Sequence, residues 1–370
     1  MFQRLIKNDL KENKVSMLVI GLFLLLTLTL SFAATRLTVS LTSSIERFVE
    51  TAKSPHLLQM HSGSVDRERL QNFVQQYPEI ASWQLTDFVN VEGSAIRING
   101  QDSLQDSSQD NGFSSQNQNF DFLLDQDNQP AQPRPGQVYI PLYYYNSGKI
   151  KIGDQIRVGK LQLTVQGFIR DAQMNASLVS SKRFLISQTD LQILKTEAFA
   201  SNENLIAFRV HKLSQISTIE QAYKNAELES NGPPMITYPT IKMINGFNDA
   251  LVILVMGLLV MAIIGMTFLC MRFALLTKIQ EDLQQIAVMK VMGLPQSFIS
   301  RVYLTKYYFC LALATIAGWG LSFLLSSPFK KQMALSMGQS PTPFYSYLLE
   351  MLVALLLCLL VFWLTARPLS

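Results

Sequence analysis

The side chains that most often carry enzyme chemistry are few in this sequence and form no recognisable catalytic pattern. No H-E-x-x-H, C-x-x-C or G-x-x-x-x-G-K-[ST] pattern occurs, so no zinc-protease, dithiol or Walker-type nucleotide site is predicted. His56 and His61 are close enough in sequence to share a metal site, but we favour the interpretation that they are surface residues. We therefore predict no catalytic, cofactor-binding or metal-binding residue, and we expect that the chain is not an enzyme.

Long apolar segments dominate the rest of the sequence. Charged residues make up only 16% of the 370 residues, against about 25% in an average soluble protein, and the net charge is +4. This small charge does not suggest a nucleic-acid partner. About 20 apolar residues cross the hydrocarbon core of a bilayer, and four segments reach that length. We predict an α-helical bundle of four transmembrane helices, at 15–36, 249–272, 302–328 and 344–366.

The three cysteines, Cys270, Cys310 and Cys358, each fall in a different predicted transmembrane segment, so they are interpreted as small apolar core residues. The first segment has one alternative, because basic residues before it and the small residues Ser31 and Ala33 also resemble a cleaved signal peptide. We favour an uncleaved helix.

Basic residues predict the orientation. Lys and Arg are concentrated in residues 1–14 and in the connection 273–301, and such short basic segments stay in the cytoplasm. Both termini are then cytoplasmic, with an amphipathic helix at 1–14 that carries Phe2, Leu5, Ile6 and Leu10 along the membrane interface. Residues 37–248 lie outside the cytoplasm, between the first and second transmembrane helices.

The extracytoplasmic segment 37–248 is expected to be a mixed α+β domain. Residues 66–77 have the spacing of a short amphipathic helix capped by Asp66, and 215–228 suggests another helix. Residues 138–169 alternate apolar and polar residues between glycine-containing turns, which is typical of short strands. Residues 101–136 hold eight Gln and six Asp, and this composition predicts a mobile insert that is dispensable for folding. Its apolar knot, Phe120, Phe122, Leu123 and Leu124, either packs back on the domain, which we favour, or contacts a ligand or partner.

Two charged residues, Glu350 and Lys306, lie near the ends of predicted transmembrane helices. An ionised group inside the bilayer is costly, so such residues are functional candidates. We favour the simpler interpretation that both side chains reach to the membrane interface.

The connection between the second and third transmembrane helices contains a helix with an apolar face. Leu283, Ile286, Ala287 and Val291 continue to Leu294 and Phe298 at helical spacing, and Gly293 and Pro295 then end the helix. The predicted cytoplasmic segments are too short to cover this face, so a partner protein is expected to cover part of it.

In this segment the sequence resembles the MacB/FtsX-type ABC transporter permeases (type VII, mechanotransmission fold). The family pattern E-[IL]-[AG]-[IV]-[LM]-[KR]-[AV]-[ILM]-G is similar to residues 285–293, QIAVMKVMG, with Gln285 in place of the acid and Ala287 in place of the usual glycine. Residues 153–158 (GDQIRV) and 165–167 (VQG) resemble the end of the family's MacB-like periplasmic core. The residues that the resemblance assigns to ATPase coupling are Leu283, Gln285, Ile286, Ala287, Val288, Met289, Lys290, Gly293 and Pro295.

The resemblance implies a permease subunit in the bacterial cytoplasmic (inner) membrane, as a homodimer or with a paralogous permease. A separate ABC ATP-binding subunit would bind ATP and Mg²⁺, and its motion would pass through the membrane to the extracytoplasmic domain. This chain would hold no cofactor and would contact membrane lipid. The expected activity is efflux or extraction of a peptide, antibiotic, lipid-linked or other amphiphilic substrate.

Several alternatives stay open from the sequence alone. An FtsX-like regulator would activate an extracytoplasmic cell-wall hydrolase and transport nothing. A sensor with an extracytoplasmic domain is less favoured, because the sequence shows no cytoplasmic output module. The sequence also does not distinguish a complete permease from the first half of a longer one.

Overall fold

The chain forms two compact units in the computed structural model, which describes residues 14–100, 102–293 and 295–366. The helical unit falls within 1–42, 248–332 and 341–370, and the sheet domain comprises 43–247 and 333–340. Residues 1–13, which make up nearly all of the amphipathic helix expected at 1–14, lie outside the described residues.

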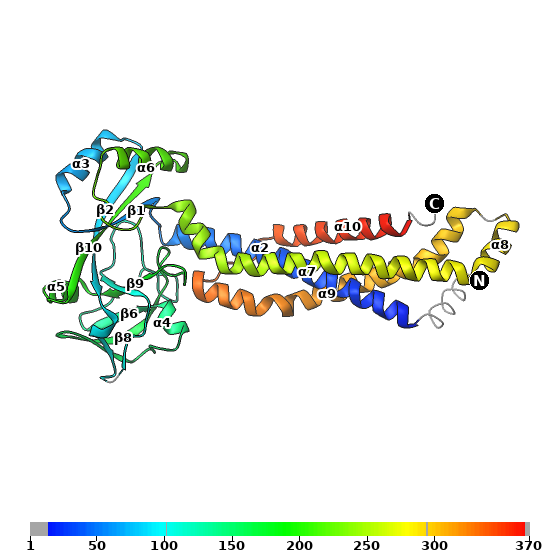
Figure 1. The fold of residues 1–370 in the computed structure, drawn as a ribbon, viewed down its shortest axis with the longest axis horizontal. Helices are drawn as coiled ribbons and strands as arrows, with labels where there is room; N and C mark the ends of the chain where they lie inside the picture. The colour runs from blue at the N-terminus through cyan, green and yellow to red at the C-terminus, as the bar shows by residue number, and fades with distance from the viewer. Residues whose placement is uncertain (1–13, 101, 294, 367–370) are drawn as a thin grey trace. The chain divides into compact units, whose positions relative to one another are not determined.

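The helical unit is built from long apolar helices that Figure 1 shows running side by side. Within the described residues, three helical stretches are long and apolar enough to cross a membrane: Leu18–Thr51, Tyr238–Ala274 and Tyr308–Met337. A fourth helix has a shorter apolar stretch, Tyr345–Leu360. The helices that carry these stretches are α2 (Lys14–Thr51), α7 (Tyr238–Glu281), α9 (Gln296–Met337) and α10 (Tyr345–Ala366), and the short helix α8 (Leu283–Val291) joins α7 to α9.

A single row of side chains on α2 forms the centre of the helical unit. Residues four apart lie above one another on a helix, and the row of α2 repeats with this spacing. Gly318 of α9 allows a close approach, because a Cβ atom there would lie 3.1 Å from Leu28 Cβ. The buried residues of this core are Ile20, Leu24, Leu28 and Phe32 of α2, Met271 of α7, and Leu311 and Ala314 of α9.

The sheet domain is organised around one mixed sheet of eleven strands, in the order β11-β1-β10-β2-β5-β9-β6-β8-β7-β3-β4. The pairs β5–β9 and β6–β8 are parallel, and the other neighbours are antiparallel. The strands are β1 (Leu57–Ser62), β2 (Ile80–Val91), β3 (Ile96–Ile98), β4 (Asp102–Ser103), β5 (Asp110–Ser114), β6 (Gln137–Pro141), β7 (Gln155–Val158), β8 (Leu161–Ile169), β9 (Ser181–Ile186), β10 (Ala200–Val210) and β11 (Ile236–Thr237).

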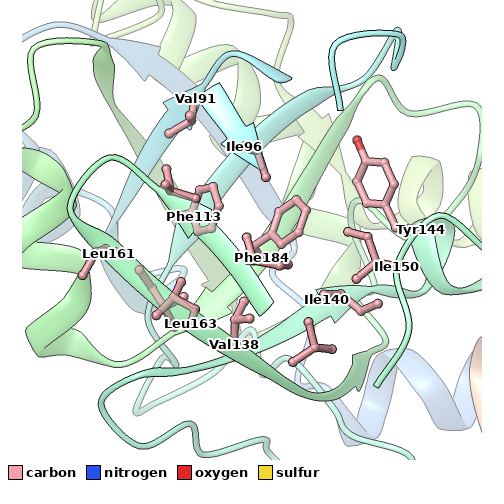
Figure 2. Close-up of a cluster of buried hydrophobic side chains, with 14 of the residues drawn as sticks. Val91, Ile96, Phe113, Val138, Ile140, Tyr144, Ile150, Leu161, Leu163 and Phe184 are labelled. Atoms are coloured by element: carbon pink, nitrogen blue, oxygen red, sulfur yellow. The ribbon is translucent and has the colours of Figure 1, made fainter. Parts of the chain in front are cut away.

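The two largest apolar clusters of the sheet domain lie around Phe184 and around Phe208. In the larger one, Phe113 of β5 stacks on Phe184 of β9 with ring centroids 4.9 Å apart, and Tyr144 packs against the same Phe184 ring (Figure 2). In the second cluster, α3 (Arg67–Gln76) and α6 (Ile216–Asn225) pack on the sheet, with Phe73 edge-on to Phe208 and Tyr223. The remaining short helices are α4 (Leu142–Asn146) and α5 (Gln188–Lys195).

Local signals in the sequence predict several of these elements. The helix expected at 66–77 is α3, and the Asp66 side chain accepts a hydrogen bond from the Arg69 backbone N–H, as its capping role requires. The helix expected at 215–228 is α6. Within 138–169 the strand prediction is wrong for residues 142–154, which form α4 and then the turns that lead to β7.

The structure gives residues 101–136 a different role from the mobile insert that their composition predicts. Strand β5 lies inside the sheet between β2 and β9, and its Phe113 is fully buried. The apolar knot packs back on the domain, as favoured: Phe120 joins a cluster with Phe88, and Leu123 packs with Ile169 and Leu185. Composition misled here because a few apolar residues at the inward positions suffice for burial, while Gln116 and Asp125 bond the backbone of the same segment.

A buried ion network ties this segment to the sheet. Arg183 of β9 is fully buried and bonds Asp121 at 2.9 Å and Asp171 at 2.8 Å. Gln173 donates a further hydrogen bond to Asp121. Arg183 is the counter-charge for both carboxylates, so its removal would leave Asp121 and Asp171 buried without compensation.

Candidate functional site

The segment between α7 and α9 begins with a break in the helix at Asp282. Helix α7 ends at Glu281, and α8 starts at Leu283 with its first backbone hydrogen bond from Ile286 N–H to Asp282 O at 2.9 Å. Lys290 lies in the last turn of α8, where a cation interacts favourably with the carbonyl end of the helix. Figure 1 shows α8 between the ends of α7 and α9.

Gly293 ends α8 in the left-handed conformation. Its φ is +79°, and its N–H donates to Lys290 O at 3.0 Å, while Met292 N–H donates to Val288 O at 3.0 Å. Glycine adopts this conformation without the steric cost that a Cβ atom brings. A Cβ atom at Gly293 would meet no other atom within 4 Å, so this glycine is needed for backbone conformation and not for close packing within the chain. Pro295 then precedes the start of α9 at Gln296.

Helix α8 presents apolar side chains that nothing in the described chain covers. Val291 is 88% exposed and Met292 65%, while Leu283 and Val288 are each 57% exposed. Val288, Val291 and Met292 follow i, i+3, i+4 spacing and therefore share one helix face. We call these four residues the α8 apolar patch.

The patch differs in part from the expected face. Leu283 and Val291 belong to both, and Ala287 is exposed as well, but Ile286 is half-buried. Met292 was missed as a member, although its spacing from Val288 is visible in the sequence. Leu294 and the side chains of Gln285, Met289 and Phe298 lie outside the described residues, so their roles stay predictions.

The two histidines considered for a metal site are occupied by other contacts. His56 is buried, and its Nδ1 accepts a hydrogen bond from the Val210 N–H at 2.9 Å, so the expectation that it is a surface residue is wrong. Burial, and secondarily the charge of Arg209, lower the pKa of His56 to about 4. His61 Nδ1 accepts from Asn231 N–H at 3.1 Å. The described residues contain no cluster of three or more potential metal ligands.

Glu350 does not extend away from the helices, as a side chain reaching to the membrane interface would. Its carboxylate is buried in the helical unit, where it pairs with Arg36 of α2 and accepts a hydrogen bond from Trp319 of α9. The sequence analysis missed Arg36 because it stands at the end of the first apolar segment. The signal was its position four residues after Phe32, which continues the buried row of α2. The side chain of Lys306 lies outside the described residues.

Residues 250–370, which contain α8, α9, α10 and most of α7, match the family described as FtsX-like permease C-terminal. This region of the chain is an FtsX-like permease domain. The predicted resemblance to FtsX-type permeases is thereby confirmed for this region, and its apolar helices agree with a membrane protein. The family match includes the α8 apolar patch.

Solved structures give weaker likenesses. The periplasmic region of MacB from Actinobacillus actinomycetemcomitans is 10% identical, with 54% of this chain and 96% of that chain covered and a TM-score of 0.29. The extracellular domain of the noncanonic ABC-type transporter YknZ from Gram-positive bacteria is 11% identical, with 49% of this chain and 98% of that chain covered and a TM-score of 0.27. A domain of a putative permease protein from Porphyromonas gingivalis is 12% identical, with 46% of this chain and 82% of that chain covered and a TM-score of 0.26. Similarity at this level does not establish a shared function, and no curated protein sequence matches the chain.

Proposed function

We propose that this FtsX-like permease is the membrane subunit of an ABC transporter and that α8 docks on a separate ATP-binding subunit. The observation that supports this proposal is the α8 apolar patch, which lies within the family-matching region and stays exposed. ATP and Mg²⁺ would bind to the partner subunit, and hydrolysis would take place there.

The spacing of Val288, Val291 and Met292 suits a groove on another protein. Burying a valine, leucine or methionine side chain contributes about 1.5–3 kcal/mol, so four such side chains favour association appreciably. A short helix with anchors at i, i+3 and i+4 is a common way to bind a partner groove. The positive φ of Gly293 supports the same role, because it turns the chain sharply after the patch.

The proposed arrangement has four membrane-spanning helices, with α10 as the fourth, and both termini in the cytoplasm of a bacterial cell. The sheet domain is then extracytoplasmic and receives motion from the membrane helices. Two such chains, or this chain and a paralogue, would assemble with two ATP-binding subunits. An amphiphilic substrate such as a peptide, an antibiotic or a lipid-linked molecule suits a domain that works at the membrane surface.

Two substitutions in α8 test the docking. Val288→Asp places a carboxylate in the patch, and Gly293→Leu forces a β-carbon into the left-handed region, which costs about 1–2 kcal/mol. Both variants are expected to insert in the membrane as the parent does, but to lose co-purification with the ATP-binding subunit and any stimulation of its ATPase rate in reconstituted membranes. Gln284→Ala, also exposed on α8, is the matched control and is expected to bind normally.

Normal binding and normal ATPase stimulation in both variants would show that α8 is only a connector. A permease that binds the ATPase but moves no amphiphilic compound in vesicles, while it increases the activity of an added cell-wall hydrolase, would support the regulatory alternative.

A further inference from the structure

An ion pair joins the first and last apolar helices inside the helical unit. Arg36 Nε of α2 donates to Glu350 Oε1 of α10 at 2.8 Å, and Arg36 Nη2 donates to Glu350 Oε2 at 2.6 Å. The two side chains are only 1% and 2% exposed. Both oxygens of the carboxylate are engaged by one guanidinium, which is the two-point geometry that makes such pairs strong and directional.

Helix α9 contributes the rest of the cluster. Trp319 Nε1 donates to Glu350 Oε2 at 3.0 Å, and the Arg36 guanidinium lies 3.6 Å from the centre of the Phe323 ring. The Trp319 and Phe323 rings meet edge to face, with centroids 5.0 Å apart. Helices α2, α9 and α10 therefore all contribute side chains to the polar cluster around the buried pair.

Arg36 and Glu350 both stand at positions on the buried faces of their helices. Arg36 continues the row of buried residues on α2 that ends with Phe32, and Glu350 lies one turn after the buried Ser346 on α10. A buried charge pair is a poor way to gain stability, because both ions lose their hydration. Ionisable residues inside a membrane protein are instead candidates for a specific role.

We propose that Arg36, Glu350 and Trp319 are positioning residues that lock α2, α9 and α10 into one rigid body. The close approach at Gly318 joins α2 to α9 in the same body. Helix α7 is much less enclosed: 11% of its most apolar window is buried inside the chain, against 39% for α2 and 28% for α9. When the permease changes state, α2, α9 and α10 keep their mutual arrangement.

The first experiment tests the lock without reference to transport. Thermal unfolding of the full chain in lipid nanodiscs is measured for Arg36→Ala, Glu350→Ala, Arg36→Lys and the exchanged pair Arg36→Glu with Glu350→Arg. Each alanine variant is expected to lower the unfolding midpoint by roughly 5–10 °C, because it leaves a buried charge unpaired. Lysine cannot make the two-point contact, so the midpoint of Arg36→Lys is expected to stay close to that of Arg36→Ala. The exchanged pair is expected to recover about half of the midpoint lost in the alanine variants.

Lys331→Ala, an exposed cation on α9, is the control and is expected to leave the midpoint unchanged. An exchanged pair that is destabilised as much as the two alanine variants would overturn the lock, since a specific pair must be recoverable by exchange. Unchanged midpoints in both alanine variants would overturn it as well.

The second experiment rests on the proposed function, because it asks what moves when an ATP-binding subunit acts. In a background without the native cysteines, spin labels are placed on Leu26 of α2 and Leu355 of α10, both exposed, and distances are measured in the full complex with and without a non-hydrolysable ATP analogue. The α2–α10 distance distribution is expected to stay single and unchanged. A matched pair on Leu26 and Leu258 of α7 provides the comparison.

A nucleotide-dependent change in the α2–α10 distance would overturn the rigid body, even if the exchanged pair recovers stability. If no ATP-binding subunit associates with the chain, the proposed function fails, and the exchange experiment alone then decides whether the lock exists.

Discussion

Arg170 lies directly after β8 in the sheet domain. Its Nε donates a hydrogen bond to the carbonyl oxygen of Leu335 at 2.8 Å. Leu335 lies in the last turn of α9, where backbone carbonyls have no partner within the helix. Asn175 donates to the next such carbonyl, that of Ser336, at 3.0 Å. The same guanidinium bonds Asn128 Oδ1 at 2.8 Å, so one buried cation joins the end of α9 to the segment that follows Leu124.

Replacing Arg170 by alanine is expected to loosen residues 333–340 from the sheet domain. A hydrogen bond to a charged group contributes about 1.5–3 kcal/mol, which corresponds to roughly 10- to 100-fold faster amide exchange in this segment. Hydrogen exchange of the full chain, followed by mass spectrometry, measures the change. Arg134→Ala, an exposed arginine, is the control, and equal exchange in the two variants would contradict the capping role.

Residues 101–136 are expected to be indispensable for the sheet domain. Phe113→Ala removes a fully buried ring and is expected to cost about 3–5 kcal/mol. Gly112→Ala is expected to be damaging as well, because its Cβ atom would lie 1.8 Å from Cζ of the buried Phe88. Limited proteolysis of the full chain is expected to cut the sheet domain faster in both variants, but not in Asn119→Ala, an exposed position. Resistance to proteolysis in both variants would support the original expectation of a dispensable insert.

His56 is expected to make the region around β1 and β10 sensitive to acid. The pKa of His56 is lowered to about 4, mainly by burial, whereas an unfolded histidine titrates near its ordinary 6.5. The unfolded state therefore binds the proton first, and stability is lost as the pH falls from about 6.5 to about 4. The loss is on the order of 3 kcal/mol, because each pKa unit of difference between the folded and unfolded states corresponds to about 1.4 kcal/mol.

Hydrogen exchange of the β1 and β10 peptides between pH 7 and pH 4, corrected for intrinsic exchange, measures this loss. His56→Gln has no titrating ring, so its local stability is expected to change less over the same range. His61→Gln is the control and is expected to keep the pH dependence of the parent chain.

Single-cysteine labelling in membranes tests the proposed orientation. In a background without Cys270, Cys310 and Cys358, a cysteine at Asn119 of the sheet domain is expected to react with an impermeant reagent from outside the cell. A cysteine at Gln284 of α8 is expected to react only after the membrane is permeabilised. Both side chains are exposed in the structure, so access depends on the side of the membrane. Labelling of Gln284→Cys in intact cells would contradict this orientation.

The sequence by itself determined the features that depend on local pattern. Uncharged segments predict apolar helices because only length and hydropathy decide whether a helix suits a bilayer, and the structure has such helices. Asp66 predicts the start of α3 and Gly293 the end of α8, because capping depends on one or two neighbouring residues. The same local pattern around residues 285–293 was enough to indicate the FtsX-like permease domain that residues 250–370 match.

Only the tertiary structure decided which distant residues meet. Arg36 and Glu350 are 314 positions apart, and neither carries a local signal that names its partner. Phe113 stands in a Gln- and Asp-rich segment, yet it reaches the core because β5 pairs with β9 from another part of the chain. Burial and charge pairing depend on contacts between elements that are distant in the sequence. The fold brings these elements together, and composition and periodicity do not show which elements will meet.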